Sequence, residues 1–113
     1  EKPPAIIQGE IHAPDNVKHP LKAVLFVIAR RAKEGGGPPV AVVRLKPKAF
    51  PQRFELGKGD MVMGGNWPEE VWLEARLDMD GNAMTKSKDD WTTSMVGPAS
   101  QGAKDVSLIL AAQ

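Results

Sequence analysis

The chain has 113 residues, of which 42% are hydrophobic and 26% are charged, and its formal net charge is +1. This composition predicts a folded domain of ordinary size and excludes the strongly basic surface typical of nucleic-acid-binding proteins. The sequence contains no cysteine, which excludes disulfide bonds, thiolate metal sites and thiol nucleophiles.

We expect residues 1–113 to form a single domain, with residues 1–5 as a flexible, proline-containing lead-in. The longest hydrophobic stretch covers residues 23–29, which is far short of the roughly 20 residues that cross a bilayer. We therefore expect any membrane anchor to lie in a segment that precedes Glu1.

Short hydrophobic runs are separated by turns, because 11 glycines and 10 prolines interrupt the chain. This spacing is typical of strands and leaves too little room for helices. Residues 57–70 are the least regular segment, and Pro68 is a candidate start for a helical turn there. The expected strands cover, in chain order, residues 6–11, 23–30, 40–45, 53–56, 71–79, 82–86, 91–96 and 105–110.

Two of these strands have distinctive patterns. Residues 23–30 are almost continuously hydrophobic, which predicts a central strand that is buried on both faces. Residues 71–79 alternate strictly, which predicts one buried and one exposed face. The Asp80-Gly81 pair that follows predicts a tight hairpin turn. The expected inward-facing residues of this strand are Val71, Leu73, Ala75, Leu77 and Met79.

Together these elements predict an all-β fold, an immunoglobulin-like or cupredoxin-like antiparallel β-sandwich of about seven to eight strands. A partner that binds by adding a strand needs an exposed sheet edge. The first strand, which is flanked by prolines, and the short strand at 92–96 are the candidate edges.

Aromatic and arginine side chains are enriched where proteins contact one another. Trp72 falls on the otherwise charged face of the strand at 71–79, so it either packs under a loop or contacts a partner. The candidate binding residues are Trp67, Trp72, Trp91, Arg30 and Arg76.

A copper site is an alternative interpretation, because thioethers suit Cu(I). Met61 and Met63 lie two residues apart and would share one face of a strand, and His12 and His19 are the other candidate ligands. Packing of these methionines in the core or a loop is the competing explanation.

Catalysis has little support in the sequence. The serines lie in no Gly-x-Ser-x-Gly context, and adjacent acidic residues such as Asp89 and Asp90 point in opposite directions along an extended chain. We therefore expect a binding domain that is not an enzyme and that holds no cofactor.

Several short segments together form one ordered pattern, namely residues 9–11, 25–30, 37–45, 50–51, 54–56, 60–61, 75–78, 81–83 and 106–108. Their order and spacing resemble the C-terminal periplasmic domain of the cytochrome c biogenesis protein family CcmI (CycH).

This resemblance implies an assembly role in c-type cytochrome maturation, in which the domain holds apocytochrome c or the haem-ligation machinery. It also implies a periplasmic or outer-surface location, with membrane contact only through an anchor outside the chain, and no nucleic-acid partner. Two alternatives stay open, a small copper-handling domain and a generic accessory β-sandwich of a larger lipid-anchored protein.

Overall fold

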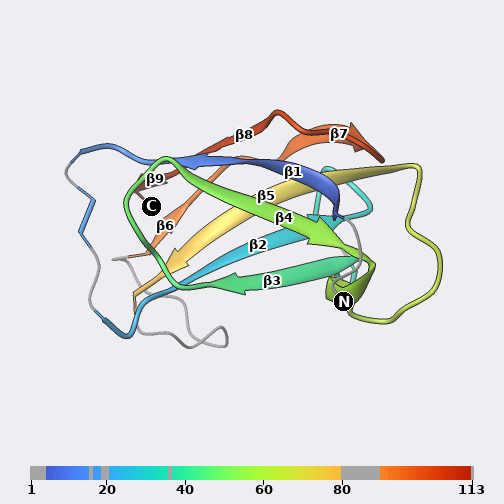
Figure 1. Cartoon of the computed structure of the whole chain (residues 1–113), viewed down its shortest axis with the longest axis horizontal. Coiled ribbons are helices and arrows are strands. Elements are labelled where there is room, and N and C mark those ends of the chain that lie inside the picture. Colours follow the sequence, from blue (N-terminus) through green and yellow to red (C-terminus); the bar gives the residue numbers. More distant parts are fainter. Residues whose placement is uncertain (1–4, 16, 19–20, 36, 80–89, 113) are drawn as a thin grey trace.

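The computed structural model describes residues 5–15, 17–18, 21–35, 37–79 and 90–112 (Figure 1). Within these ranges a short 3₁₀ helix, η1, covers Lys58–Asp60, and no helical segment has the length and hydrophobicity of a membrane span. The strands are β1 Ala5–His12, β2 Val24–Arg30, β3 Ala41–Leu45, β4 Gln52–Gly57, β5 Glu70–Asp78, β6 Trp91–Thr92, β7 Val96–Ser100, β8 Val106–Ile109 and β9 Ala111–Ala112.

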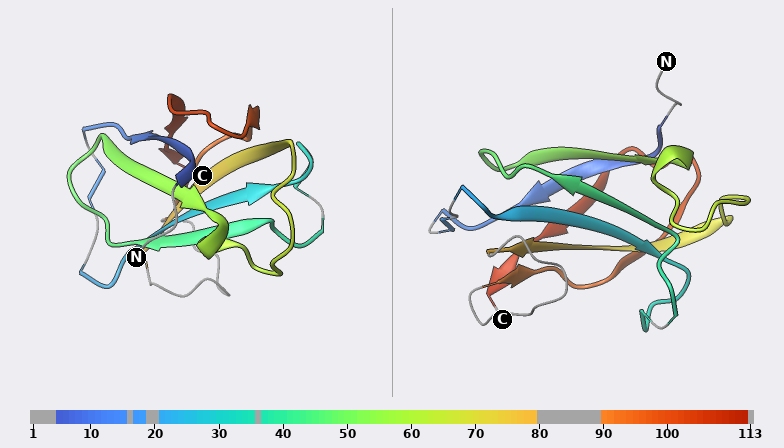
Figure 2. Two further views of the ribbon diagram at one scale, coloured as in Figure 1. Left: turned by 45° about the vertical axis from the view of Figure 1, so that its right-hand side comes forward. Right: turned by 90° about the horizontal axis from the view of Figure 1, so that it is seen from below.

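The strands form two sheets that pack face to face (Figures 1 and 2). The smaller sheet has the order β4-β1-β8, and the larger has the order β3-β2-β5-β6-β9, with β7 also paired to β5. The predicted antiparallel, immunoglobulin-like sandwich is confirmed. One pair is an exception, because β1 and β8 run parallel and place Gly9 opposite Val106.

The core lies between the sheets and follows from the period-two alternation of the strands. In the larger sheet the inward side chains of β2 and β5 are fully buried, and in the smaller sheet the inward side chains of β1, β4 and β8 meet them. These residues are Leu25, Val27, Ala29, Leu73, Ala75 and Leu77 on one side and Ile7, Ile11, Phe54, Leu56 and Leu108 on the other.

The structure corrects the prediction that β2 is buried on both faces. Its inward face is buried, but Ile28 and Arg30 on the outward face are only half-buried. Met79, expected on the inward face of β5, lies in the turn after that strand and packs half-buried against the core. The predicted hairpin turn at Asp80-Gly81 and the strand at 82–86 lie outside the described residues.

The segment predicted as one strand at 91–96 is two strands, β6 and β7. Thr93 interrupts the ladder, because its hydroxyl oxygen accepts a hydrogen bond from the Ala75 N–H at 3.0 Å, alongside the Thr93 N–H bond to the Ala75 carbonyl. Similarly, the predicted strand at 105–110 ends early, and the chain changes sheets at the buried Leu110 before β9.

The first predicted sheet edge was wrong, because β1 lies between β4 and β8. The second predicted edge, residues 92–96, divides between β6, which lies between β5 and β9, and the start of β7, which pairs only with β5 among the described strands. The edges of the described sheets include β4 in the smaller sheet and β3 in the larger one.

The helical turn that was expected to start near Pro68 lies earlier in the chain, in η1 at Lys58–Asp60. There the Asp60 carboxylate accepts a hydrogen bond from the Gly57 N–H at 2.9 Å.

Gly9 is required by the close approach of β1 to its neighbours. A Cβ atom at this position would lie 2.2 Å from the carbonyl oxygen of Val106 and 2.9 Å from the ring of Phe54. We expect Gly9→Ala to lower the free energy of unfolding by about 2–3 kcal/mol, because the backbone of β8 must move to make room.

Gly59→Ala is the matched control, since a Cβ atom there would have no neighbour within 4 Å. Urea denaturation of the two variants checks the prediction. A Gly9→Ala domain as stable as Gly59→Ala would contradict the close β1–β8 contact.

Candidate protein-binding face

The outward side of β3, β2 and β5 carries a row of arginine and aromatic side chains. Because Leu25, Val27 and Ala29 face the core, the alternate residues of β2 face outward. The cross-strand partners continue this side, with Phe26 opposite both Arg44 and Arg76 and with Arg30 opposite Trp72. We call this surface the arginine–aromatic face, and it consists of Phe26, Arg30, Arg44, Trp72, Glu74 and Arg76.

Phe26 lies at the centre of this face between two guanidinium groups. The guanidinium carbons of Arg44 and Arg76 lie 5.5 and 5.7 Å from its ring centroid, which is cation–π distance. Phe26 is only 5% exposed. Two guanidinium groups therefore lie over an aromatic ring on this face.

Arg76 also forms an ion pair with Asp78, which lies two residues further along β5. Its Nη2 atom lies 2.8 Å from an oxygen of Asp78, whose side chain is fully buried. Arg44, in contrast, is exposed at the edge of the sheet. The two arginines thus differ in environment, since Arg76 is paired with a buried carboxylate and Arg44 is open to solvent.

Trp72 is held on three sides. The Lys33 ammonium lies 5.8 Å from its ring centroid, and Gly97 of β7 approaches the indole closely enough that a Cβ atom there would lie 3.0 Å from it. Across the strand, Arg30 forms an ion pair with Glu74 and donates a second hydrogen bond to the Gly35 carbonyl. Trp72 is therefore half-buried, with Lys33 and Gly97 against its indole.

These features suit protein recognition. Side chains that are already fixed lose little conformational entropy on binding, and Trp and Arg are frequent at binding hot spots. The face carries Arg30, Arg44 and Arg76 against Glu74 and the buried Asp78, and the two carboxylates pair with Arg30 and Arg76, so the exposed Arg44 supplies the remaining positive charge. Its excess of positive charge favours a partner that offers acidic groups.

The structure brings together three of the five candidate residues, namely Trp72, Arg30 and Arg76. Trp67 is only 6% exposed and belongs to the core. Trp91 pairs with the inward-facing Leu77 and packs half-buried against the core. Neither indole contributes to the arginine–aromatic face.

Sequence reasoning missed Phe26 and Arg44. Phe26 lies inside the continuous hydrophobic run of β2, where the only polar residue on the outward side is Arg30 at the end of the strand. Its orientation becomes predictable only once β2 is aligned with β5, because the alternation of β5 then determines which residues of β2 face the core.

The candidate copper ligands do not converge in the structure. Met61 packs half-buried against the core beside Ala41, whereas Met63 is 77% exposed and lies outside any strand. His12 lies at the opposite end of the sandwich, roughly 20 Å away along β1 and β4, as the strand rise requires. His19 lies outside the described residues, and within the described residues no group of three His, Cys, Asp or Glu side chains could hold a metal.

The two arginines that flank Phe26 provide a matched test of the buried ion pair. We expect Arg76→Leu to lower the free energy of unfolding by about 3 kcal/mol, because buried Asp78 loses the guanidinium that faces it. Arg44→Leu should cost only about 1 kcal/mol, since leucine still covers Phe26 and only the cation–π contact is lost. Equal losses in urea denaturation would contradict this assignment.

The fold has a counterpart among solved structures. An alternative pilotin from the type II secretion system of Vibrio cholerae superposes with a TM-score of 0.60 and 17% sequence identity, over 95% of each chain. At this identity the likeness concerns the fold alone. No curated protein sequence matches the chain.

The sequence profile of one protein family covers most of the sandwich, from residue 7 to residue 110. That stretch runs from within β1 to the residue that follows β8, and it includes every strand that contributes to the arginine–aromatic face. The chain therefore belongs to the family of cytochrome c-type biogenesis protein H Ig-like domains.

Proposed function

We propose that this domain is a non-catalytic, extracytoplasmic holding module that binds apocytochrome c or its haem-ligation proteins through the arginine–aromatic face. The family connects the chain with c-type cytochrome maturation. The observation that carries the proposal is the row in which Arg44 and Arg76 flank Phe26. This row forms a pre-ordered, positively charged surface on the outside of the larger sheet.

The chemistry of the face indicates what it recognises. Arg44 is exposed and Trp72 is half-buried at the surface, so a partner segment meets a cation and an aromatic plane together. A segment that carries carboxylates beside hydrophobic side chains satisfies both groups. Recognition of this kind requires no reacting group, which agrees with a holding role.

Charge reversal at Arg44 tests the role of the face. We expect Arg44→Glu to weaken binding of apocytochrome c, or of the maturation protein that the domain captures from native envelopes, by about tenfold or more. Arg44 is exposed, so the domain should keep its fold. Mass spectrometry of the captured proteins identifies the partner, and fluorescence anisotropy with the purified partner measures the affinity.

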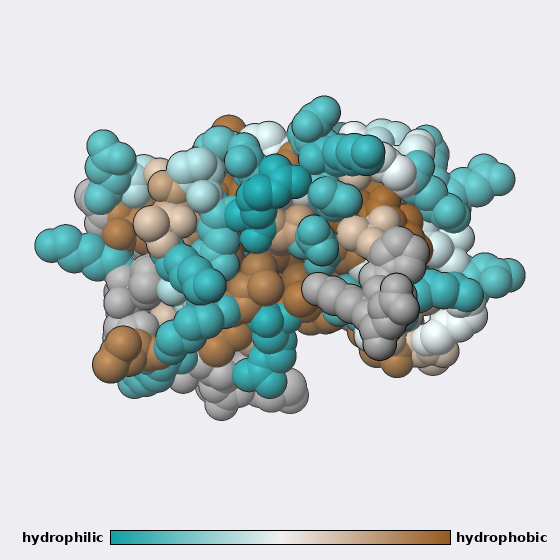
Figure 3. Space-filling model, in the orientation of Figure 1, coloured by the Kyte–Doolittle hydropathy of each residue, from teal (hydrophilic) through white to brown (hydrophobic). Residues whose placement is uncertain are grey.

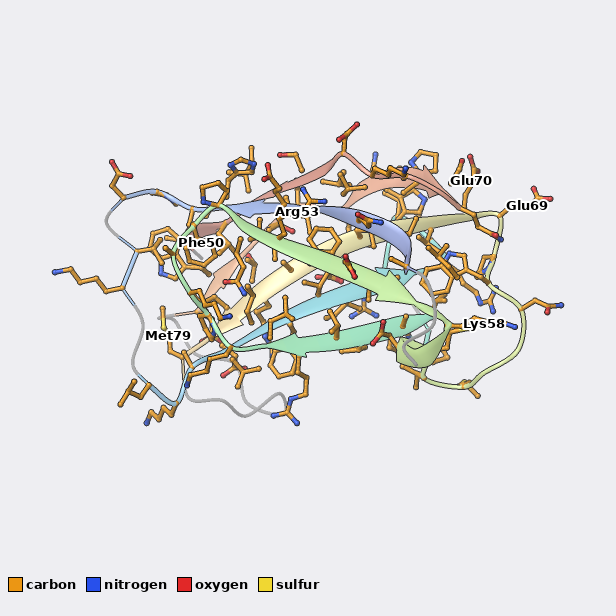
Figure 4. The ribbon with its side chains drawn as sticks, in the orientation of Figure 1. Phe50, Arg53, Lys58, Glu69, Glu70 and Met79 are labelled. Carbon is orange, nitrogen blue, oxygen red and sulfur yellow. The ribbon has the colours of Figure 1, made fainter. Side chains whose placement is uncertain are left out.

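Arg53→Glu is the matched control, because Arg53 is exposed on β4 of the other sheet (Figure 4). This variant should bind normally. Equal weakening by both variants would indicate non-specific charge attraction, and unchanged binding by Arg44→Glu would exclude the proposed face. Addition of a copper chelator during capture should have no effect, whereas chelator-sensitive capture would favour the copper alternative.

A further inference from the structure

Two loops meet at the end of the sandwich where β1 and β3 end and where β2 and β4 begin (Figure 1). The Lys46 ammonium donates a hydrogen bond to the Leu21 carbonyl and so ties the loop before β2 to the loop after β3. Gln52 stiffens the second loop, since its amide donates to the Lys46 carbonyl at 3.1 Å and accepts from the Lys48 N–H at 2.9 Å. These hydrogen bonds connect the two loops to each other and stabilise the conformation of the second loop.

A hydrophobic side chain projects from this end among lysines. Leu21 is 88% exposed, which is the highest exposure of the large hydrophobic residues in the described part of the chain. Four exposed lysines occupy the same loops. We call the group the basic tip, and it consists of Lys18, Leu21, Lys22, Lys46 and Lys48.

The charge of the basic tip is nearly uncompensated. Across residues 13–23 and 46–51 the sequence contains these four lysines and a single acidic residue, Asp15. Figure 3 shows hydrophilic side chains projecting from this end, the left-hand end of the view.

We propose that the basic tip docks the domain end-on against a bilayer that contains anionic phospholipid. The lysine ammonium groups would contact the lipid phosphates, and Leu21 would enter the interface between headgroups and acyl chains. The combination of basic residues with a projecting hydrophobic side chain is the pattern that membrane-surface segments use.

The exposure of Leu21 favours a bilayer over an acidic peptide. A peptide-binding site presents its hydrophobic contacts in a groove, where the partner supplies the projecting side chain. Leu21 itself projects, so it requires a partner that surrounds it.

End-on docking leaves the outer side of β2 and β5 accessible on the side of the sandwich, whereas Arg44 lines the same hollow as Leu21, Lys22 and Lys46. This orientation also places the opposite end, which carries Lys58, Glu69 and Glu70, away from the lipid (Figure 4). The proposal concerns residues outside the arginine–aromatic face and does not depend on the protein-binding function. Failure of either proposal therefore leaves the other intact.

Sedimentation with vesicles tests the proposal. We expect the domain to bind vesicles of phosphatidylglycerol mixed with phosphatidylcholine and not vesicles of phosphatidylcholine alone. Raising the salt from about 50 to about 500 mM should remove most of this binding, because screening weakens the lysine–phosphate attraction.

Two matched pairs of variants locate the contact. Lys22→Gln with Lys48→Gln should weaken vesicle binding by about 25-fold, since each basic residue near an anionic surface contributes roughly a fivefold factor. Lys58→Gln with Lys104→Gln removes the same charge from exposed lysines elsewhere and should change binding by less than about twofold. Leu21→Ser should weaken binding several-fold, whereas Met63→Ser, at a residue that is 77% exposed near the opposite end of the sandwich, should not.

Three results would overturn the proposal. The first is absence of binding to anionic vesicles, including the case in which the basic tip instead binds a glutamate-rich peptide. The second is equal weakening by the two double variants, which would show that only the overall charge matters. The third is unchanged binding by Leu21→Ser, which would leave a purely electrostatic contact without insertion. Circular dichroism of each variant confirms that the fold is retained.

Discussion

The burial of one face of the β2–β5 pair is the constraint on which the rest of the structure depends. Leu25, Val27, Leu73 and Leu77 are all excluded from solvent, and together they remove enough hydrophobic surface from water to anchor the larger sheet. Because the side-chain period of a strand is two, this burial forces Phe26, Trp72 and Arg76 onto the opposite face. The burial of the core side chains thus determines which side chains lie on the candidate binding surface.

The same constraint explains which parts of the structure were predictable from the sequence. The strict alternation of residues 71–79 predicts β5 and the outward position of Trp72 and Arg76, because one pattern satisfies both faces. β2 has no such alternation, so Phe26 could not be placed. Residues 96–100 contain Gly97 and Pro98 and show no hydrophobic period, and their pairing with β5 becomes visible only in three dimensions.

Sheet edges were harder to predict than strands, because pairing depends on contacts between residues far apart in the sequence. The parallel pairing of β1 with β8 joins residues almost one hundred positions apart and makes β1 an interior strand. Gly9 is a local sign of that contact, since only a residue without a side chain allows Val106 to approach so closely. The basic tip likewise combines loops from separate parts of the chain, so it could not be recognised from any single segment.

The proposed contact of partner proteins with the outer face of the larger sheet can be tested directly, because the three tryptophans are natural reporters for it. An NMR titration of the domain with apocytochrome c follows each indole N–H separately. The account predicts that the Trp72 signal and the backbone amides of Phe26 and Arg44 shift, while the buried Trp67 signal stays in place. Shifts confined to β4, β1 and β8, with Trp72 unaffected, would contradict it.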